Sequence, residues 1–248
     1  MKKFKKEFII RNYECNKNGQ ITPFYMLNYL GETSGLHSDA LGVGTKELIE
    51  KGYGWMLNRW KVKFEKYPKV KEKIIIETWT SGFEKFYANR EFIIYNGENQ
   101  EIGRATTLWI FLDINKKRPI RIPSEYSEIY NITEERAFND FYDFSNDFNI
   151  EDYLFFKVRK TDIDYNNHVN NTRYLDWILE LIPDEIEEMY FLNEFEILYK
   201  KETKYGECIM STINEGKCID DDVEFLHKII NTETNAVNTW AKTIWKKI

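Results

Sequence analysis

A segment of the chain recurs 148 residues further on, and this internal repeat limits the possible folds more than any other feature of the sequence. Residues 11–32 align without gaps with residues 159–180. Each stretch runs from a strand-like segment through a polar turn into an amphipathic helix. Four aligned positions are identical, and they pair Arg11 with Arg159, Asn18 with Asn166, Leu27 with Leu175 and Glu32 with Glu180. The repeat indicates two copies of one structural unit.

The segments that follow the two helices also correspond. Alternating, aromatic-rich patterns predict four strands after each helix. The first set is expected over 55–64, 73–79, 88–95 and 104–112, and the second over 193–199, 207–213, 223–230 and 237–245. The last strands agree in spacing, with Ala105, Thr107 and Trp109 matching Ala241, Thr243 and Trp245. The sequence therefore predicts two α+β units, in each of which antiparallel strands wrap one long helix.

Each repeated helix begins with a capping signal. Thr22 precedes Pro23, and proline is favoured at the first position of a helix. Asn170 is expected to cap the second helix, and Pro183 to end it. Spacings of i, i+3, i+4 and i+7 give the second helix one apolar stripe, expected in the core, which consists of Tyr174, Trp177, Ile178 and Leu181.

An acidic segment joins the two copies. Residues 124–152 carry nine acidic side chains against the single base Arg136, a local charge of −8 in a chain whose net charge is −6. Many aromatic residues lie within it, so we expect it to pack on a surface. The predicted organisation is an N-terminal domain over residues 1–123, a connector over 124–151 and a C-terminal domain over 152–248.

Composition favours a soluble globular protein. Hydrophobic residues make up 42% of the chain, and Pro and Gly are few, which excludes a disordered chain. No apolar run approaches the roughly 18 residues of a membrane span, and no secretory leader is recognisable, so a cytoplasmic location is expected. The three cysteines lack metal-ligand spacing. With no phosphate loop or nucleic-acid motif either, we expect no metal, cofactor, membrane or nucleic-acid partner.

The second copy carries the side chains that can do chemistry. Asp164, Asn166 and His168 place a carboxylate, an amide and an imidazole just before a helix. Free N–H groups at a helix start favour developing negative charge, so the arrangement suits attack on an acyl carbonyl. The first copy has amides at the three aligned positions, Asn16, Asn18 and Gln20, which cannot transfer a proton near neutral pH. We therefore predict one active site per chain, in the second half. The other histidines, His37 and His227, are expected to be structural.

The stretch from Asp162 to Glu180 reads Asp-Ile-Asp-Tyr-Asn-Asn-His-Val-Asn-Asn-Thr-Arg-Tyr-Leu-Asp-Trp-Ile-Leu-Glu. It resembles the signature of the acyl-ACP thioesterases, hydrolases that release fatty acids from acyl carrier protein (ACP). The resemblance is tight in this stretch and diffuse over nearly all of the remaining chain. It implies a tandem (double) hotdog fold of the α+β class, with ACP as the partner that presents the acyl group.

The same resemblance implies site residues. It makes Asn166 and His168 catalytic and gives Asp164 a functional role. A downstream segment of the family also matches Tyr199-Lys200-Lys201-Glu202-Thr203, which adds Glu202 to the catalytic set. Thr203 stands where the plant members carry a cysteine. Because a threonine hydroxyl is a weak nucleophile without an activating base, attack by water is favoured.

The expected mechanism uses His168 and Glu202 to orient and deprotonate that water. Asn166 would fix the water or the thioester carbonyl. Asp164 would hold its neighbours in place or, in a rival version, attack the carbonyl itself. Backbone N–H groups near Val169 to Asn171 would stabilise the oxyanion.

Three other functions are compatible with parts of the pattern. An acyl-CoA thioesterase is the nearest, because hotdog folds serve both carriers. A hotdog dehydratase and a non-catalytic acyl-binding module fit less well, since neither accounts for Asp164, Asn166, His168 and Glu202 together. The sequence leaves the acyl chain length open, and either a monomer or a homodimer is compatible with it.

Overall fold

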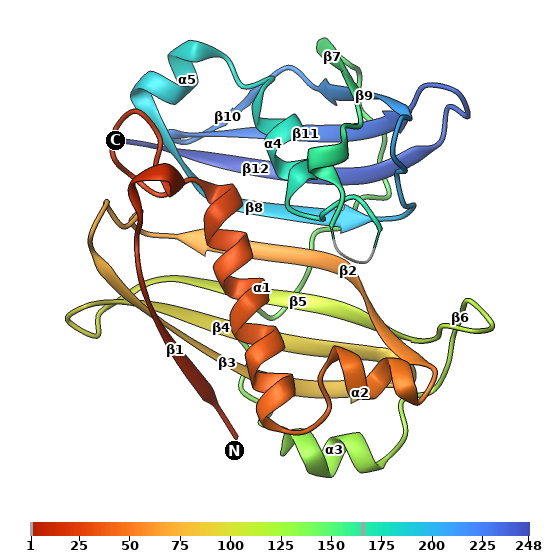
Figure 1. Cartoon of the computed structure of the whole chain (residues 1–248). Coiled ribbons are helices and arrows are strands. Elements are labelled where there is room, and N and C mark those ends of the chain that lie inside the picture. The colour runs from red at the N-terminus through yellow and green to blue at the C-terminus, as the bar shows by residue number, and fades with distance from the viewer. Residues whose placement is uncertain (1, 165–166) are drawn as a thin grey trace. The chain divides into compact units, whose positions relative to one another are not determined.

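The computed structural model describes residues 2–164 and 167–248 (Figure 1). The chain divides into two compact units, Met1–Asn139 and Asp140–Ile248, called the first and second unit below. Among the described residues, the helices are all too short or too polar to cross a membrane.

The first unit is an antiparallel sheet with one long helix. Its elements are β1 (Phe4–Ile9), a short 3-10 turn (Asn12–Glu14), α1 (Pro23–Ala40), α2 (Thr45–Glu50), β2 (Tyr53–Phe64), β3 (Lys73–Glu84), β4 (Tyr87–Asn96), β5 (Glu101–Asp113), β6 (Arg118–Pro119) and α3 (Glu125–Tyr130). The strands lie in the order β1-β3-β4-β5-β2, with β6 beside β5. The helix α1 lies across this sheet (Figure 1).

The second unit repeats this topology. Its elements are β7 (Asp152–Lys157), a 3-10 turn (Lys160–Asp162), α4 (Arg173–Leu179), α5 (Asp184–Met189), β8 (Tyr190–Tyr199), β9 (Cys208–Ile213), β10 (Lys217–Ile219), β11 (Asp222–Asn231) and β12 (Val237–Lys247). The strands lie in the order β7-β9-β11-β12-β8, with β10 beside β11. Each strand of this path has a counterpart at the same place in the first unit, so the predicted repeat and the eight predicted strands are confirmed.

The helices of the two units differ, and here one prediction was wrong. The helix α1 begins as predicted, with Pro23 at its first position and the Thr22 hydroxyl accepting a hydrogen bond from the Tyr25 N–H. The stretch aligned with α1 is not one long helix but two short ones, α4 and α5. Pro183 separates them and aligns with Gly35, which lies inside α1. The proline ring clashes with the carbonyl four residues earlier, that of Leu179, which is the last residue of α4.

The predicted apolar stripe lies in the core of the second unit. Tyr174, Trp177, Ile178 and Leu181 are all buried. His227 is buried there too and is hydrogen-bonded through Nε2 to the Thr243 hydroxyl at 2.9 Å, while burial lowers its pKa to about 3. In the first unit, His37 is buried beside the Arg90 guanidinium. Both histidines have the structural roles predicted for them.

The acidic segment packs on protein surface along much of its length. In the first unit, Trp79 donates a hydrogen bond from its ring to the Glu135 carbonyl at 2.8 Å, and Glu91 accepts one from the Ala137 N–H at 3.1 Å. In the second unit, Glu196 accepts hydrogen bonds from the Tyr142 N–H. The aromatic content of the segment therefore indicated packing correctly.

Candidate active site

The motif of the second unit folds into a tight loop closed by a β-bridge. Ile163 pairs with Val169, and the Asp164 N–H donates to the His168 carbonyl at 2.7 Å. The Asp164 carboxylate accepts from the His168 N–H at 3.1 Å. Asn167 has a φ of +66°, a left-handed conformation that asparagine tolerates better than most residues. Asp164 and His168 thus face each other across the loop, while Asn166 lies outside the described residues.

The first unit contains a loop with the same backbone hydrogen bonds but with amides in place of the carboxylate and the imidazole. Cys15 pairs with Ile21, and the Asn16 N–H donates to the Gln20 carbonyl at 2.8 Å. The Asn16 side chain accepts from the Gln20 N–H at 3.2 Å, and Gly19 has a φ of +70°. Each of these bonds has its counterpart 148 residues later, so the backbone frame is common to both copies, whereas Asp164 and His168 are replaced by Asn16 and Gln20.

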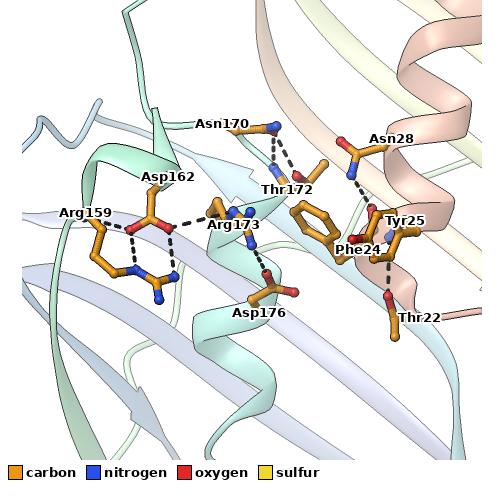
Figure 2. Close-up of polar contacts among 10 residues, drawn as sticks. All are labelled: Thr22, Phe24, Tyr25, Asn28, Arg159, Asp162, Asn170, Thr172, Arg173 and Asp176. Carbon is orange, nitrogen blue, oxygen red and sulfur yellow. Dashed lines mark hydrogen bonds and ion pairs between the residues drawn. The ribbon is translucent and has the colours of Figure 1, made fainter. Parts of the chain in front are cut away.

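A buried carboxylate anchors the loop of the second unit. Asp162 is 0% exposed and accepts hydrogen bonds from the Arg159 backbone N–H at 2.7 Å and from the Arg159 guanidinium at 2.9 and 3.2 Å (Figure 2). The Arg173 Nε lies 3.8 Å from the same carboxylate. Burial by itself disfavours the charge, but these cationic partners hold the pKa of Asp162 below its ordinary value. The Asp162 carbonyl accepts the Asn170 N–H at 2.8 Å, which ties the anchor to the loop.

Glu202 is brought to this loop from the segment after β8. The His168 Nε2 lies 3.4 Å from the Glu202 Oε1, a distance at which the two groups form an ion pair when the imidazole is protonated. Their side chains are 61% and 46% exposed. An imidazole that is next to a carboxylate and open to solvent can take a proton from water and pass it on. Two residues that are far apart in sequence therefore meet as predicted.

The backbone around Glu202 is fixed from three elements. Thr203 is fully buried, its N–H donates to the Tyr174 hydroxyl at 3.1 Å, and its own hydroxyl accepts from the Asn238 amide at 2.9 Å. The Tyr199 hydroxyl donates to the Asn171 carbonyl at 2.9 Å and joins this segment to the motif loop. Asn238 gave no signal in the sequence, and Tyr174 was recognised only as a core residue.

The start of α4 lies later than predicted, and Asn170 is not its cap: Thr172 holds the N-cap position and makes no side-chain capping bond. The helix begins at Arg173, and the Asn170 side chain accepts hydrogen bonds from the N–H and hydroxyl of Thr172 just before it (Figure 2). The Asn170 N–H is occupied by the Asp162 carbonyl. Of the three amides expected to hold the oxyanion, only those of Val169 and Asn171 therefore lack a partner within the part of the chain that the structure describes.

The structure adds one acid that the sequence analysis did not select. Burial raises the pKa of Asp176 to about 6, although the Arg173 guanidinium donates to its carboxylate at 3.0 Å (Figure 2). The aligned residue of the first unit is Asn28, a neutral amide. The sequence did contain a signal for Asp176, because this acid directly precedes Trp177, a member of the apolar stripe of the second helix.

Two family models match the chain and together span most of it. The acyl-ACP thioesterase N-terminal domain matches residues 1–130, and the acyl-ACP thioesterase C-terminal domain matches residues 147–247. The chain belongs to the acyl-ACP thioesterase family. Members of this family are thioester hydrolases, so this acyl-ACP thioesterase is an enzyme, as the motif predicted.

Known proteins agree with the assignment. The dodecanoyl-[acyl-carrier-protein] hydrolase of Cinnamomum camphora is 25% identical over 98% of this chain and 67% of its own length. An acyl-ACP thioesterase structure from Bacteroides thetaiotaomicron superposes with a TM-score of 0.87 at 24% identity, covering 98% of each chain. A Lactobacillus plantarum protein described as an oleoyl thioesterase gives 0.91 at 24% identity, over 99% of this chain and 96% of its own. The structural likeness shows the fold, and the predicted tandem hotdog is confirmed.

Proposed function

We propose that this thioesterase hydrolyses fatty acyl-ACP to a free fatty acid and holo-ACP by attack of water on the thioester, at one site in the second unit. The observation that carries the proposal is the His168–Glu202 pair at 3.4 Å, set on a loop whose copy in the first unit has Gln20 instead of histidine. The fold is common to both units, but the proton-transferring group occurs in one of them.

In this mechanism His168 takes a proton from a water molecule while the water oxygen attacks the carbonyl carbon. The Glu202 carboxylate orients the imidazole and stabilises the imidazolium that forms. The negative charge passes to the carbonyl oxygen, to which the N–H groups of Val169 and Asn171 would donate, because both lack a partner among the described residues. Collapse of the tetrahedral intermediate breaks the carbon–sulfur bond, and the departing thiolate takes the proton back from His168.

Asp164 and Asn166 have supporting roles in the proposal. The Asp164 carboxylate holds the His168 backbone, and Asn16 makes the same bond in the first unit. Because this bond belongs to the common frame, we assign Asp164 to orientation instead of nucleophilic attack. Asn166 is proposed to fix the water or the carbonyl on the strength of the family resemblance alone.

Thr203 supports attack by water. Its hydroxyl is buried and already accepts a hydrogen bond from Asn238. Within the described residues, the side chains hydrogen-bonded to Thr203 are those of Asn238 and Tyr174, and neither is a general base. A nucleophile needs an activating base and access to the substrate. Thr203 is therefore assigned to holding Glu202 in place.

The proposal also names the carrier of the acyl group. ACP is the proposed partner, and acyl-CoA hydrolysis is the alternative because a hotdog fold serves both carriers. The His168–Glu202 pair is exposed to solvent and can transfer a proton, which favours an enzyme over a binding module, because binding requires no proton transfer. A cytoplasmic location, a monomeric or homodimeric state, and domain boundaries at residues 124 and 152 stay predictions.

The test is thiol release from a panel of acyl-ACP and acyl-CoA thioesters by the wild type and by His168→Ala. We expect faster turnover of acyl-ACP, and a fall of about 10²–10⁴-fold in kcat in the variant. Gln20→Ala is the matched control, because it changes the same position of the same loop in the first unit and should keep full activity. Full activity in His168→Ala, or an equal loss in the control, would remove the proposed site.

A further inference from the structure

A cavity of about 450 Å³ lies in the first unit, beside the turn between β3 and β4. Its wall includes Lys85 from that turn, Arg121 from the segment before α3, and Ser124 and Ser127 at α3. Pockets of this volume take small organic molecules. All of its lining residues belong to the first unit, so the catalytic residues proposed above are not among them.

The two cations of the cavity have no partner. Within residues 2–164 and 167–248, neither the Lys85 nor the Arg121 side chain forms an ion pair or a hydrogen bond. No carboxylate lines the cavity. Two uncompensated positive charges facing one cavity favour an anion.

The backbone holds these groups together. The Ile122 N–H donates to the Lys85 carbonyl at 2.9 Å, which joins the turn to the segment that carries Arg121. The Ser127 N–H donates to the Ser124 carbonyl at 3.0 Å and fixes the first turn of α3. The charged and hydroxyl groups therefore stand on segments whose positions are set by main-chain hydrogen bonds.

The remaining wall of the cavity is apolar. Ile122 is buried and belongs to an aromatic cluster with Phe111 and Tyr126, and Phe83 packs against that cluster. Burial raises the pKa of Tyr126 to about 12, so its hydroxyl is neutral and adds no charge. An inorganic anion would leave this apolar wall without contacts, whereas a molecule with an apolar body would cover it.

We propose that this cavity binds an alkyl carboxylate, with its head group at Lys85 and Arg121 and its chain against Phe83 and Ile122. A guanidinium matches the two oxygens of a carboxylate in a fork geometry, and the two serine hydroxyls can donate to the same head group. The choice of a carboxylate over other alkyl anions rests on the proposed function, because hydrolysis releases such a molecule. The cavity is then a product-binding site separate from the residues that form the product.

The test measures decanoate binding to the full chain by titration calorimetry. We expect Lys85→Gln combined with Arg121→Gln to weaken binding at this site by about 10-fold or more, since the carboxylate loses its charge-assisted hydrogen bonds. The matched control is Lys117→Gln combined with Arg118→Gln, which removes the same charge from the neighbouring hairpin without altering the cavity. The control should bind decanoate like the wild type.

Three outcomes would overturn the proposal. They are unchanged decanoate binding in the cavity variant, an equal loss in the hairpin variant, and inorganic phosphate or decyl phosphate binding more tightly than decanoate. Thiol release from acyl-ACP is measured in parallel and should be retained in the cavity variant. A wild type that binds decanoate through Lys85 and Arg121 but releases no thiol would refute the proposed function and leave this site standing.

Discussion

The three aspartates around the motif differ in charge environment although they are close in sequence. Asp162 is buried against two arginines, which hold its pKa below the ordinary value. Asp164 lies in the loop and holds the His168 backbone. Asp176 is 36% exposed along its side chain, and burial raises its pKa to about 6. The same residue type thus serves as anchor, as loop support and as a group that titrates near neutral pH, because the environment sets the free energy of the charged form.

Replacing Asp162 with Asn should damage both stability and catalysis. The amide cannot compensate Arg159 and Arg173, so we expect the free energy of unfolding to fall by about 2–4 kcal/mol. The loop that carries His168 loses its anchor, so kcat should fall while KM changes little. Denaturant unfolding and steady-state kinetics measure the two effects.

Glu14→Gln is the control for that variant, since Glu14 is the aligned carboxylate of the first unit and accepts from the Arg11 N–H at 2.7 Å. It should lose stability but keep kcat. A normal kcat in Asp162→Asn would show that the anchor does not position the catalytic loop.

The raised pKa of Asp176 predicts a pH-dependent stability. The folded state binds this proton more tightly than the unfolded state, so the contribution is present below about pH 4 and is lost as the pH rises through about 6. Asp176→Asn, which restores the amide found at Asn28, should raise Tm at pH 7.5 and leave Tm close to that of the wild type at pH 4. Thermal unfolding of the wild type and the variant at both pH values measures these Tm differences. A lower Tm for the variant at pH 7.5 would mean that the bond to Arg173 outweighs burial.

At the scale of elements, one proline accounts for the difference between the helices of the two units. The helix α1 runs for 18 residues, with Gly35 in its interior, whereas Pro183 at the aligned position separates α4 from α5. The strands tolerate the change because their order is set by ladder pairing within each unit. The motif loop keeps its bonds in both units, so the site does not depend on a long helix behind it.

Substitutions at Gly35 test this account. A Cβ added there meets no atom within 4 Å, so Gly35→Ala should raise the free energy of unfolding by about 0.5–1 kcal/mol through helix propensity. Gly35→Pro should lower it by about 3 kcal/mol or more and reduce helical circular dichroism. If the proline variant keeps both the helical signal and the stability, the explanation for the split of α4 and α5 is wrong.

At the scale of the whole molecule, duplication explains why one chain has two similar units and a single predicted site. Cross-strand pairing places Thr107 opposite Trp60 and Thr243 opposite Phe195, so β2 and β8 correspond with an offset of 135 residues. By this correspondence Tyr67 occupies the position of Glu202. The first unit therefore lacks the carboxylate of the catalytic pair as well as the imidazole.

Restoring the motif in the first unit should not create a second site. Asn16→Asp combined with Gln20→His, introduced into His168→Ala, is expected to release no more thiol from acyl-ACP than His168→Ala alone, because Tyr67 cannot replace Glu202 as a partner for the new imidazole. The parent His168→Ala serves as the reference. Recovery of activity in the combined variant would show that Glu202 is dispensable and would return the first unit to consideration as a catalytic unit.

The sequence by itself determined the repeat, the eight main strands, the start of α1 and the position of the histidine, because these depend on periodicity, capping and residue chemistry that lie within short stretches. The tertiary structure decided how distant segments meet. It brought Glu202 to His168, buried Thr203 between Tyr174 and Asn238, and occupied the Asn170 amide that was expected to serve the oxyanion. It also raised the pKa of Asp176. Burial and hydrogen-bond partners arise only when separate elements pack, so no local pattern could have specified them.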